Sequence, residues 1–236
     1  MIRNGTLYLI PAVIADGTQD HVIPLRVRET LRTLRYFLAE DVRTTRRYFS
    51  SMKVFENLDE LQFAVFNKDT VEDGLPELMM PLLEGHDMGI VSESGCPGIA
   101  DPGALAVRYA HQNKISVVPL VGPSSILLAL MASGLNGQHF AFRGYLPVNQ
   151  KETAKAIREF ERESRLKSQT QIFIETPYRN TKLLQSLILH LQPDTRLCVA
   201  VDLTSPLEKI ISKPVGDWKR EPVEMLKSPA IFLFLA

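Results

Sequence analysis

The residues best suited to bind a small molecule lie in one loop, between residues 90 and 103, where the sequence reads IVSESGCPGIADPG. Three glycines, two prolines, two serines, Glu93 and Asp101 occur there. Glycine lets a backbone take positive φ and approach a ligand closely, while proline keeps the loop rigid. Serine hydroxyls and carboxylates can accept hydrogen bonds from a ligand. The loop therefore predicts a site that binds a small molecule through backbone, hydroxyl and carboxylate groups.

The segments on either side of this loop indicate a strand before it and a helix after it. An apolar run from Met88 to Val91 predicts a buried strand, and residues 104–112 have helical spacing. Open α/β sheets bind ligands beyond the carboxyl ends of their strands. A plain strand-to-helix turn is the alternative, but such a turn needs only about 2–6 residues.

Motifs for covalent, dinucleotide or metal chemistry are missing from the sequence. No two of the 13 glycines lie two residues apart, which excludes the GxGxxG dinucleotide fingerprint. Ser94 lacks the preceding glycine of a nucleophile elbow. Cys96 is a candidate nucleophile for which no sequence signal supplies a base. The five histidines are scattered, so no metal site is expected.

Charge is balanced over the chain but unevenly distributed along it. There are 27 Lys and Arg residues and 27 Asp and Glu residues, so no global field favours nucleic acid or a membrane surface. Eight cations crowd residues 26–53, whereas Lys68 is the only cation between Glu56 and Asp101. Two solvated faces would account for this split, and a basic patch for an anionic substrate is the other interpretation.

Cysteine usage and the N-terminus bear on localisation. Cys96 and Cys198 are the only cysteines, which gives no disulfide framework. The N-terminus does not resemble a signal peptide, and the longest apolar stretch, residues 126–132, is too short to cross a membrane. We expect a cytoplasmic protein without a membrane partner.

Alternation of strand and helix patterns predicts an α/β domain over residues 1–142. Near-continuous apolar strands favour a mostly parallel sheet with flanking helices. The strands are expected at residues 6–10, 36–39, 63–66, 88–91 and 115–120, the last as a buried strand. The helices are expected from Pro24, over residues 44–49, 69–83 and 104–112, and up to Ser133. The last helix is apolar nearly all round, which predicts burial between layers or at a subunit contact.

The remaining residues, 143–236, predict an α+β domain with a mixed sheet, after an inter-domain hinge over residues 138–147. Helices are expected over residues 151–167, 180–191 and near 218–226. Strands are expected over residues 170–175 and 230–235, and near 197–203 and 209–212.

Five separated blocks in this sequence resemble one family. They are AEDVRTTR from Ala39, VSESGCPGIADPG from Val91, VPLVGPSSILLALMASGL from Val118, FAFRGYLP from Phe140 and IFIETPYRN from Ile172. Together they resemble the tetrapyrrole-methylase superfamily of S-adenosylmethionine-dependent methyltransferases. The resemblance is greatest to the branch that 2′-O-methylates a cytidine of small-subunit ribosomal RNA.

The resemblance implies a two-domain fold, a homodimer, and S-adenosylmethionine bound in the cleft between the domains. It also implies which residues contact this cofactor. They are Ser94, Gly95, Pro97, Ile99, Ala100, Asp101, Pro123, Ser124, Leu146, Pro147, Thr176, Pro177, Pro229 and Ala230.

The cofactor carries an activated methyl group, so the protein must bind it, orient it and exclude water. A ribose hydroxyl acceptor would be helped by a nearby carboxylate or cation that takes or polarises its proton. Asp41 and Arg43 are the candidates, with Glu175 as an alternative. The arginines between Arg26 and Arg47 are the candidates for contacts with RNA phosphates.

The sequence departs from the ribosomal-RNA branch at three places. PAVIADGT follows the first strand instead of a TPIGN-like turn, and only Pro11 is kept. Residues 93–97 read Glu-Ser-Gly-Cys-Pro where the branch has Asp-Ala-Gly-Thr-Pro. The chain also stops at the last strand, without the branch's C-terminal extension. These changes leave two other readings open: a tetrapyrrole or protein acceptor, and a non-catalytic module that binds the cofactor.

Overall fold

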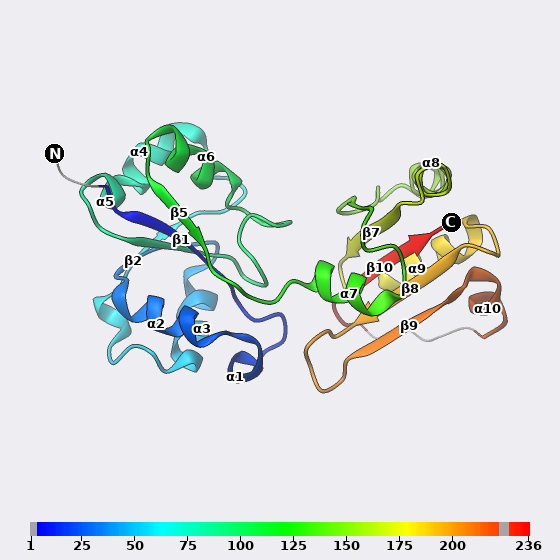
Figure 1. Cartoon of the computed structure of the whole chain (residues 1–236), viewed down its shortest axis with the longest axis horizontal. Helices are drawn as coiled ribbons and strands as arrows, with labels where there is room; N and C mark the ends of the chain where they lie inside the picture. Colours follow the sequence, from blue (N-terminus) through cyan, green and yellow to red (C-terminus); the bar gives the residue numbers. More distant parts are fainter. Residues whose placement is uncertain (1–3, 222–226) are drawn as a thin grey trace. The chain divides into compact units, whose positions relative to one another are not determined.

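The computed structural model describes residues 4–221 and 227–236 and divides into two compact units, Met1–Ser124 and Ser125–Ala236 (Figure 1). The sequence placed this boundary after residue 142, but the structure groups residues 125–142 with the second unit. Helix α7 (Ser125–Ser133) packs on the second sheet, and β6 (Phe140–Phe142) pairs with β7 (Thr170–Glu175). The hinge expected over residues 138–147 therefore belongs to the second unit as well.

The described part of the first unit contains a five-stranded parallel sheet in the order β3-β2-β4-β1-β5. Its strands are β1 (Thr6–Ile10), β2 (Tyr36–Ala39), β3 (Gln62–Val65), β4 (Met88–Val91) and β5 (Ser116–Pro119). All four residues of β4 are buried, as expected for a central parallel strand covered on both faces. The predicted α/β architecture with a parallel sheet is confirmed.

Helices cover both faces of this sheet (Figure 1). On one face, α2 (Leu25–Thr33) and α3 (Val42–Met52) pack on Phe37. On the other face, α5 (Met80–Leu83) and α6 (Ala104–Gln112) pack on Leu38. The shorter helices are α1 (Gln19–Val22), η1 (Leu58–Glu60), η2 (Glu72–Gly74) and α4 (Leu75–Leu78). The connections after β1 and β4 thus leave toward opposite faces, and such a switch point is where α/β sheets bind ligands.

Two predicted elements of the first unit differ in the structure. The single helix expected over residues 69–83 is broken into η2, α4 and α5. Pro76 and Pro81 each start a new short helix because proline cannot donate the backbone hydrogen bond that a continuous helix requires. The strand near residues 115–120 is an edge strand whose two end residues are exposed, so the prediction that it is buried was wrong.

The described part of the second unit contains a mixed sheet in the order β6-β7-β10-β8-β9. Only the β6–β7 pair within it is parallel. Its remaining strands are β8 (Arg196–Val201), β9 (Lys209–Pro214) and β10 (Ala230–Leu235). The helices are α7, α8 (Gln150–Lys167), α9 (Asn180–His190) and α10 (Val215–Arg220). Residues 222–226, the end of the helix expected near residues 218–226, lie outside the described residues.

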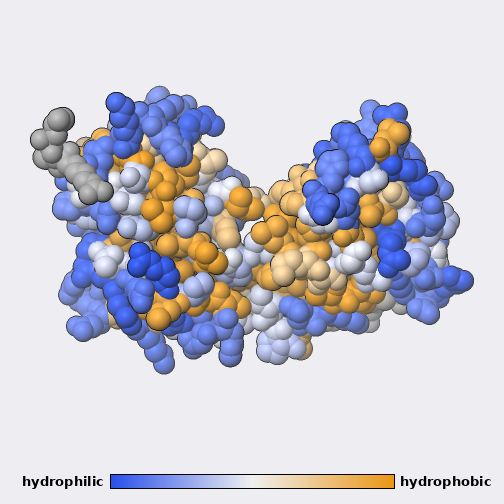
Figure 2. Space-filling model, in the orientation of Figure 1, coloured by the Kyte–Doolittle hydropathy of each residue, from blue (hydrophilic) through white to orange (hydrophobic). Residues whose placement is uncertain are grey.

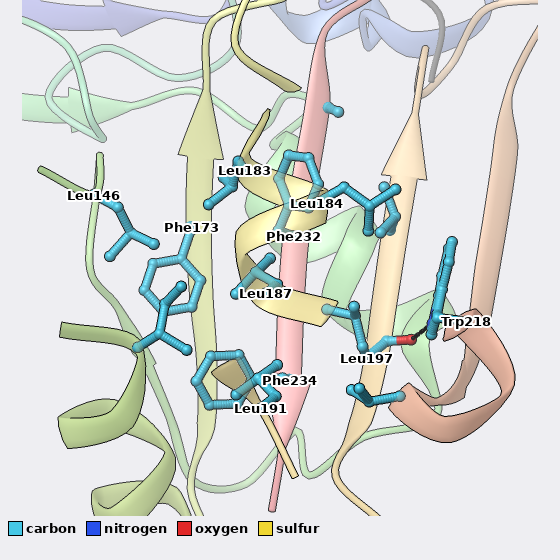
Figure 3. Close-up of a cluster of buried hydrophobic side chains, with 14 residues drawn as sticks. Leu146, Phe173, Leu183, Leu184, Leu187, Leu191, Leu197, Trp218, Phe232 and Phe234 are labelled. Atoms are coloured by element: carbon cyan, nitrogen blue, oxygen red, sulfur yellow. Dashed lines mark hydrogen bonds between the residues drawn. The ribbon is translucent and has the colours of Figure 1, made fainter. Parts of the chain in front are cut away.

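Alternation along the strands divides the second core into two layers. Phe173, Phe232 and Phe234 point to the face covered by α9, where they pack with Leu187 (Figure 3). Their sequence neighbours, such as Leu233, point to the other face, where α7 lies. Each face is therefore fixed by the two-residue period of the strands.

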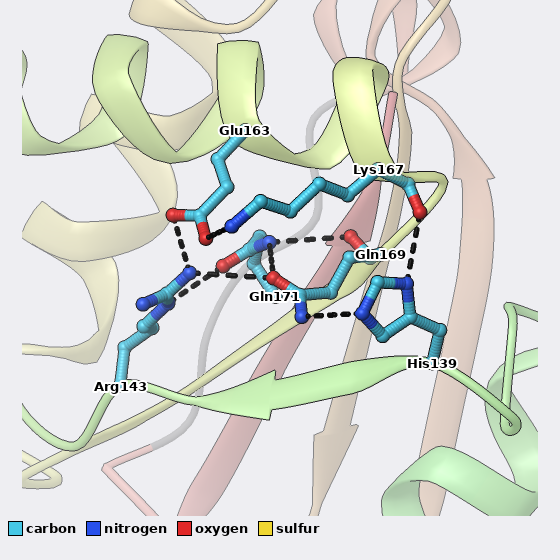
Figure 4. A network of polar contacts seen from close by, with 6 residues as sticks. All are labelled: His139, Arg143, Glu163, Lys167, Gln169 and Gln171. Carbon is cyan, nitrogen blue, oxygen red and sulfur yellow. Dashed lines mark hydrogen bonds and ion pairs between the residues drawn. The ribbon is translucent and has the colours of Figure 1, made fainter.

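A polar network fastens the end of α8 to β6 and β7 (Figure 4). Arg143 on the β6 side pairs with Glu163 of α8 at 2.5 Å and donates a 2.7 Å hydrogen bond to Gln171. His139 Nδ1 lies 2.9 Å from the carbonyl of Lys167, and its Nε2 lies 3.0 Å from the amide nitrogen of Gln169. These partners favour the neutral tautomer with the proton on Nδ1.

No helix within residues 4–221 and 227–236 is long and apolar enough to cross a membrane.

Candidate cofactor and acceptor site

The loop after β4 is tied to the loop after β1. The backbone N–H of Ala12 donates a 2.8 Å hydrogen bond to the carbonyl of Gly95, and the two residues form an isolated antiparallel bridge. The hydroxyl of Tyr48, on α3, donates a 2.9 Å hydrogen bond to the carbonyl of Pro11. Backbone contacts thus hold three segments together at the carboxyl edge of the sheet.

Two glycines in this region cannot be replaced without strain. Gly95 has φ of +68°, a left-handed conformation that side chains with a Cβ rarely adopt. A Cβ on Gly122 would lie 2.1 Å from Cβ of Pro11, so the loop after β5 also packs directly on the loop after β1. The sequence singled out Gly95 for its conformational freedom, and its positive φ fits that expectation; the close packing of Gly122 was not predicted.

Cys96 is held as a protonated thiol. Its Sγ lies 3.4 Å from the carbonyl oxygen of Pro123, to which it donates a hydrogen bond. Burial and, secondarily, the charge of Asp101 raise the pKa of Cys96. A raised pKa lowers the thiolate fraction, so the geometry argues against Cys96 as a nucleophile.

Three carboxylates gather at this edge. Glu40, at the end of β2, accepts a 3.3 Å hydrogen bond from the backbone N–H of Glu93. Burial raises the pKa of Glu40; the hydrogen bond opposes this shift and the charge of Glu93 adds to it. Burial, together with the charges of Glu40 and Glu93, raises the pKa of Asp101 to about 6. The edge therefore favours a ligand that is cationic or rich in hydrogen-bond donors.

A cavity of about 250 Å³ lies beside the loop after β4, on the side of α3. Ala12 and Asp16 line it from the loop after β1, Thr44 and Arg47 from α3, and Glu93 from the loop after β4. The cofactor residues predicted in this unit lie along the same loop and on the loop after β5. Ser92 and Glu93 line the cavity, and the predicted cofactor residues Ser94 to Asp101 follow them directly in the same loop.

Asp41 and Arg43 lie at the start of α3, just before the cavity residue Thr44 in the chain, but neither lines the cavity. The carboxylate of Asp41 caps the helix by accepting a 2.7 Å hydrogen bond from the backbone N–H of Thr44. This hydrogen bond is the main reason that the pKa of Asp41 is lowered. Arg43 is exposed. The cap gives Asp41 a structural role that the sequence motif did not reveal.

Several arginines in the predicted RNA-binding stretch are already engaged within the protein. Arg28 contacts Asp20 at 2.5 Å and donates to the carbonyl of Met52. Arg46 contacts Asp59 at 2.6 Å. Arg32, Arg35, Arg43 and Arg47 are exposed and make no ion pair among the described residues. Of these four, Arg47 lines the cavity, and Arg43 lies one helical turn before it on α3.

In the second unit, the predicted residues gather around the carboxyl end of β7. Ala230, the first residue of β10, pairs with Glu175, the last residue of β7. The carbonyl of Pro229 accepts a 3.0 Å hydrogen bond from the N–H of Asp202. Arg179 lies 3.5 Å from the carbonyl of Pro147, which brings the segment of Leu146 and Pro147 to the same place.

Two buried oxygens at this end of the sheet have no hydrogen-bond donor among the described residues: Glu175 Oε2 and Asn180 Oδ1. The guanidinium of Arg179 lies 3.0 Å from Glu175 Oε2 and compensates the charge of this carboxylate. The contact does not have the geometry of a hydrogen bond. The amide of Asn180 donates a 2.6 Å hydrogen bond to the carbonyl of Ser228. Unsatisfied acceptors at this end of the sheet suit a ligand that offers amino or hydroxyl donors.

The sequence did not single out Glu40, Tyr48 or Asn180. Glu40 ends a strand next to the predicted Asp41, and this position at the carboxyl edge was the available signal. The contacts of Tyr48 and Asn180 join segments 37 and 48 residues apart, and no local pattern encodes them. Within the described residues, no group of three or more His, Cys, Asp or Glu side chains has an arrangement that would hold a metal ion.

The fold and the site define a class: two-unit methyltransferases that use S-adenosylmethionine. Among solved structures, the methyltransferase CobJ has a TM-score of 0.62 at 17% identity, over 97% of this chain and 93% of that one. A uroporphyrin-III C-methyltransferase from Thermus thermophilus, complexed with S-adenosylhomocysteine, has a TM-score of 0.58 at 16% identity, over 98% and 97%. At these identities, the likeness shows the fold.

Comparison of sequences identifies the family of this chain more specifically than the fold does. The profile of the family described as Tetrapyrrole (Corrin/Porphyrin) Methylases matches residues 17–218. The Ribosomal RNA small subunit methyltransferase I of Escherichia coli O157:H7 is 31% identical over 98% of this chain and 77% of that protein. The protein of the same name from Halalkalibacterium halodurans is 30% identical over 92% and 72%. The chain belongs to the tetrapyrrole methylase family and is a methyltransferase that uses S-adenosylmethionine.

Proposed function

We propose that this protein methylates the 2′-oxygen of a cytidine in small-subunit ribosomal RNA. The observation that carries the proposal is the alignment of 98% of the chain with a relative named for methylation of this RNA. The exposed cation Arg47, which lines the 250 Å³ cavity, and Arg43, one helical turn before it, support it, because phosphate contacts provide much of the affinity for RNA.

The residues would divide into two sets around the cofactor. The loop after β4, with Ser94, Gly95 and Asp101, and the loop after β5, with Pro123 and Ser124, would hold it from the first unit. Its other contacts would come from the second unit, in the cleft that the resemblance implies: Leu146, Pro147, Thr176, Pro177, Pro229 and Ala230. When bound, S-adenosylmethionine supplies a methyl group activated by the positive sulfur.

In the reaction, the ribose 2′-oxygen forms a bond to the methyl carbon as the carbon–sulfur bond breaks, and the hydroxyl proton passes to a base. Among the carboxylates discussed, Asp101 is best suited as that base because its pKa of about 6 lies near neutrality. Asp41 is committed to capping α3, with Arg43 beside it as a polarising cation. Glu175 is 1% exposed and paired with Arg179, which suits a positioning role.

The protein would act as a homodimer in the cytoplasm. The surface over α7 is largely hydrophobic (Figure 2), and Leu127 and Met131, one turn apart, are 51% and 79% exposed. An adjoining side of α7, with Ile126 and Leu130, is buried on the sheet. A second copy of the chain would cover the exposed side.

The acceptor class can be tested by incubating the protein with S-adenosylmethionine labelled on the methyl group and a fractionated cell extract. The proposal predicts label in the RNA of small ribosomal subunits. Label confined to the tetrapyrrole or protein fraction would show that the acceptor is a tetrapyrrole or a protein and not RNA. Cofactor binding without transfer to any fraction would indicate a non-catalytic module.

A further inference from the structure

A groove of about 470 Å³ follows one side of α9 in the second unit. Arg179, Lys182, Leu189 and His190 line it from the α9 side. Val148 and the start of α8 line it opposite. The groove extends along α9 for nearly three turns beyond Glu175, further than a cofactor at the end of β7 requires.

The accessible charge in this groove is positive. Glu175 is buried and paired with Arg179, so its charge is compensated within the protein. Lys182 is exposed and makes no ion pair among the described residues. No side chain caps the start of α9, which adds the partial positive charge of its N-terminus.

The charge of the whole unit has the same sign. Residues 125–236 contain 15 Lys and Arg against 11 Asp and Glu, a formal charge of +4, whereas residues 1–124 contain 12 against 16, a formal charge of −4. The predicted RNA contacts of Arg26 to Arg47 thus lie in the acidic unit. An RNA longer than the acceptor nucleotide would be attracted more strongly to the second unit.

Apolar and aromatic groups accompany the cations. Val148 and Leu189 line the groove and are 78% and 70% exposed. Tyr145 and Tyr178 are 57% and 83% exposed and directly precede the groove residues Leu146 and Arg179 in the chain. Cationic grooves with exposed aromatic rings bind single-stranded nucleic acid, because phosphates meet the cations and bases stack on the rings.

We propose that the groove along α9 binds a single-stranded segment of the RNA substrate outside the acceptor nucleotide. Lys182 contacts a phosphate, and Tyr178 stacks against a base. This inference rests on RNA being the substrate. An acidic protein segment would match the same charge, but the exposed tyrosines favour RNA.

The test measures binding of a fluorescently labelled, single-stranded RNA of mixed sequence by anisotropy across a salt series, with S-adenosylmethionine present. Lys182→Ala is compared with Lys209→Ala, which removes another exposed lysine of the same unit, from the edge strand β9. Lys182→Ala should weaken binding about five-fold at low salt and lower the salt slope by about 0.7, the value for one phosphate contact. Lys209→Ala should bind as the wild type does.

Tyr178→Leu should weaken binding without changing the salt slope, since stacking releases no counterions. Equal RNA affinity of wild type and Lys182→Ala would overturn the inference, as would displacement of the RNA by a poly-glutamate peptide of equal charge. If Lys182→Ala lost as much affinity for S-adenosylmethionine in calorimetry as it loses for RNA, the groove would belong to the cofactor site instead. Wild type that binds no RNA would overturn both this inference and the proposed function. Loss of affinity in Arg43→Ala/Arg47→Ala but not in Lys182→Ala would overturn the groove alone.

Discussion

The carboxylate of Glu40 accepts a hydrogen bond from the backbone N–H of Glu93 at 3.3 Å, which joins the ends of β2 and β4. The contact holds two acidic residues at the same edge as the half-buried Asp101. Their charges and the burial of Asp101 raise its pKa to about 6. The protein thus concentrates negative charge at the loop that we propose binds the sulfonium cofactor.

Asp101→Asn is expected to stabilise the protein without ligand at pH 7. Because the native pKa of about 6 exceeds the ordinary 3.8, the native state holds this proton more tightly than the unfolded chain does. The free energy of unfolding therefore falls as pH rises from about 4 to about 6. Thermal unfolding from pH 4 to pH 8 should show a gain of roughly 1 kcal/mol for the variant above pH 6, reduced from the full shift by solvent screening. If Asp101→Asn raised the free energy of unfolding by the same amount at pH 4 as above pH 6, this explanation would be wrong.

Gly95→Val is expected to abolish S-adenosylmethionine binding and to lower stability by about 1–2 kcal/mol. A β-branched residue is strained at φ of +68°, and relief of that strain would move the loop. Gly74→Val is the matched control in the same unit, since Gly74 has φ of −83° and open space around it. If calorimetry found that Gly95→Val binds S-adenosylmethionine with wild-type affinity, this loop would not be part of the cofactor site.

Arg43→Ala/Arg47→Ala is expected to lower the salt slope of RNA binding by about 1.4, the value for two contacts with single-stranded RNA. Arg46→Ala should instead reduce the free energy of unfolding by up to about 1 kcal/mol, because Arg46 is bound to Asp59 and to the carbonyl of Leu58. RNA titrations and urea unfolding of both variants distinguish these roles. If Arg46→Ala lowered the salt slope more than the double variant does, Arg46 would be the phosphate contact instead of Arg43 and Arg47.

Leu127→Asp/Met131→Asp is expected to convert a homodimer into a monomer of 26.6 kDa, the mass of one chain. Two carboxylates on the exposed side of α7 would be costly to bury in an interface. Light scattering at micromolar concentration makes the measurement, with Leu166→Asp on α8 as the control for an exposed leucine of the same unit. Wild type that scatters as a monomer would exclude the dimer.

Local patterns in the sequence predicted most of the elements. The strands at residues 6–10, 36–39, 88–91, 170–175 and 230–235 have the predicted bounds because each is an apolar run with a clear end. The break at Met79 was missed because the apolar period continues through Pro76 and Pro81. The domain boundary was placed too late because the apolar α7 fits either sheet by pattern alone, and only its packing on β8 to β10 decides.

The part of the candidate site that could be predicted from the sequence lies in one loop, the loop after β4. The glycines and prolines of the loop after β4 predicted a rigid binding loop, and the structure ties this loop to the loop after β1 at the carboxyl edge of the sheet. The pairing of Glu175 with Arg179 and the capping role of Asp41 depend on where neighbouring backbone and side chains come to lie. A sequence pattern assigns such residues to a site but does not say which of their atoms are already engaged.

The central claim, methylation of a ribose oxygen in small-subunit ribosomal RNA, is tested most directly by mapping the methyl group. Small ribosomal subunits that lack the modification are incubated with the protein and labelled S-adenosylmethionine, and the RNA is digested to nucleosides for mass spectrometry. The account predicts label in 2′-O-methylcytidine, with a rate that rises as Asp101 loses its proton near pH 6. Label on a nucleobase, or none in RNA while a tetrapyrrole or protein is methylated, would contradict it.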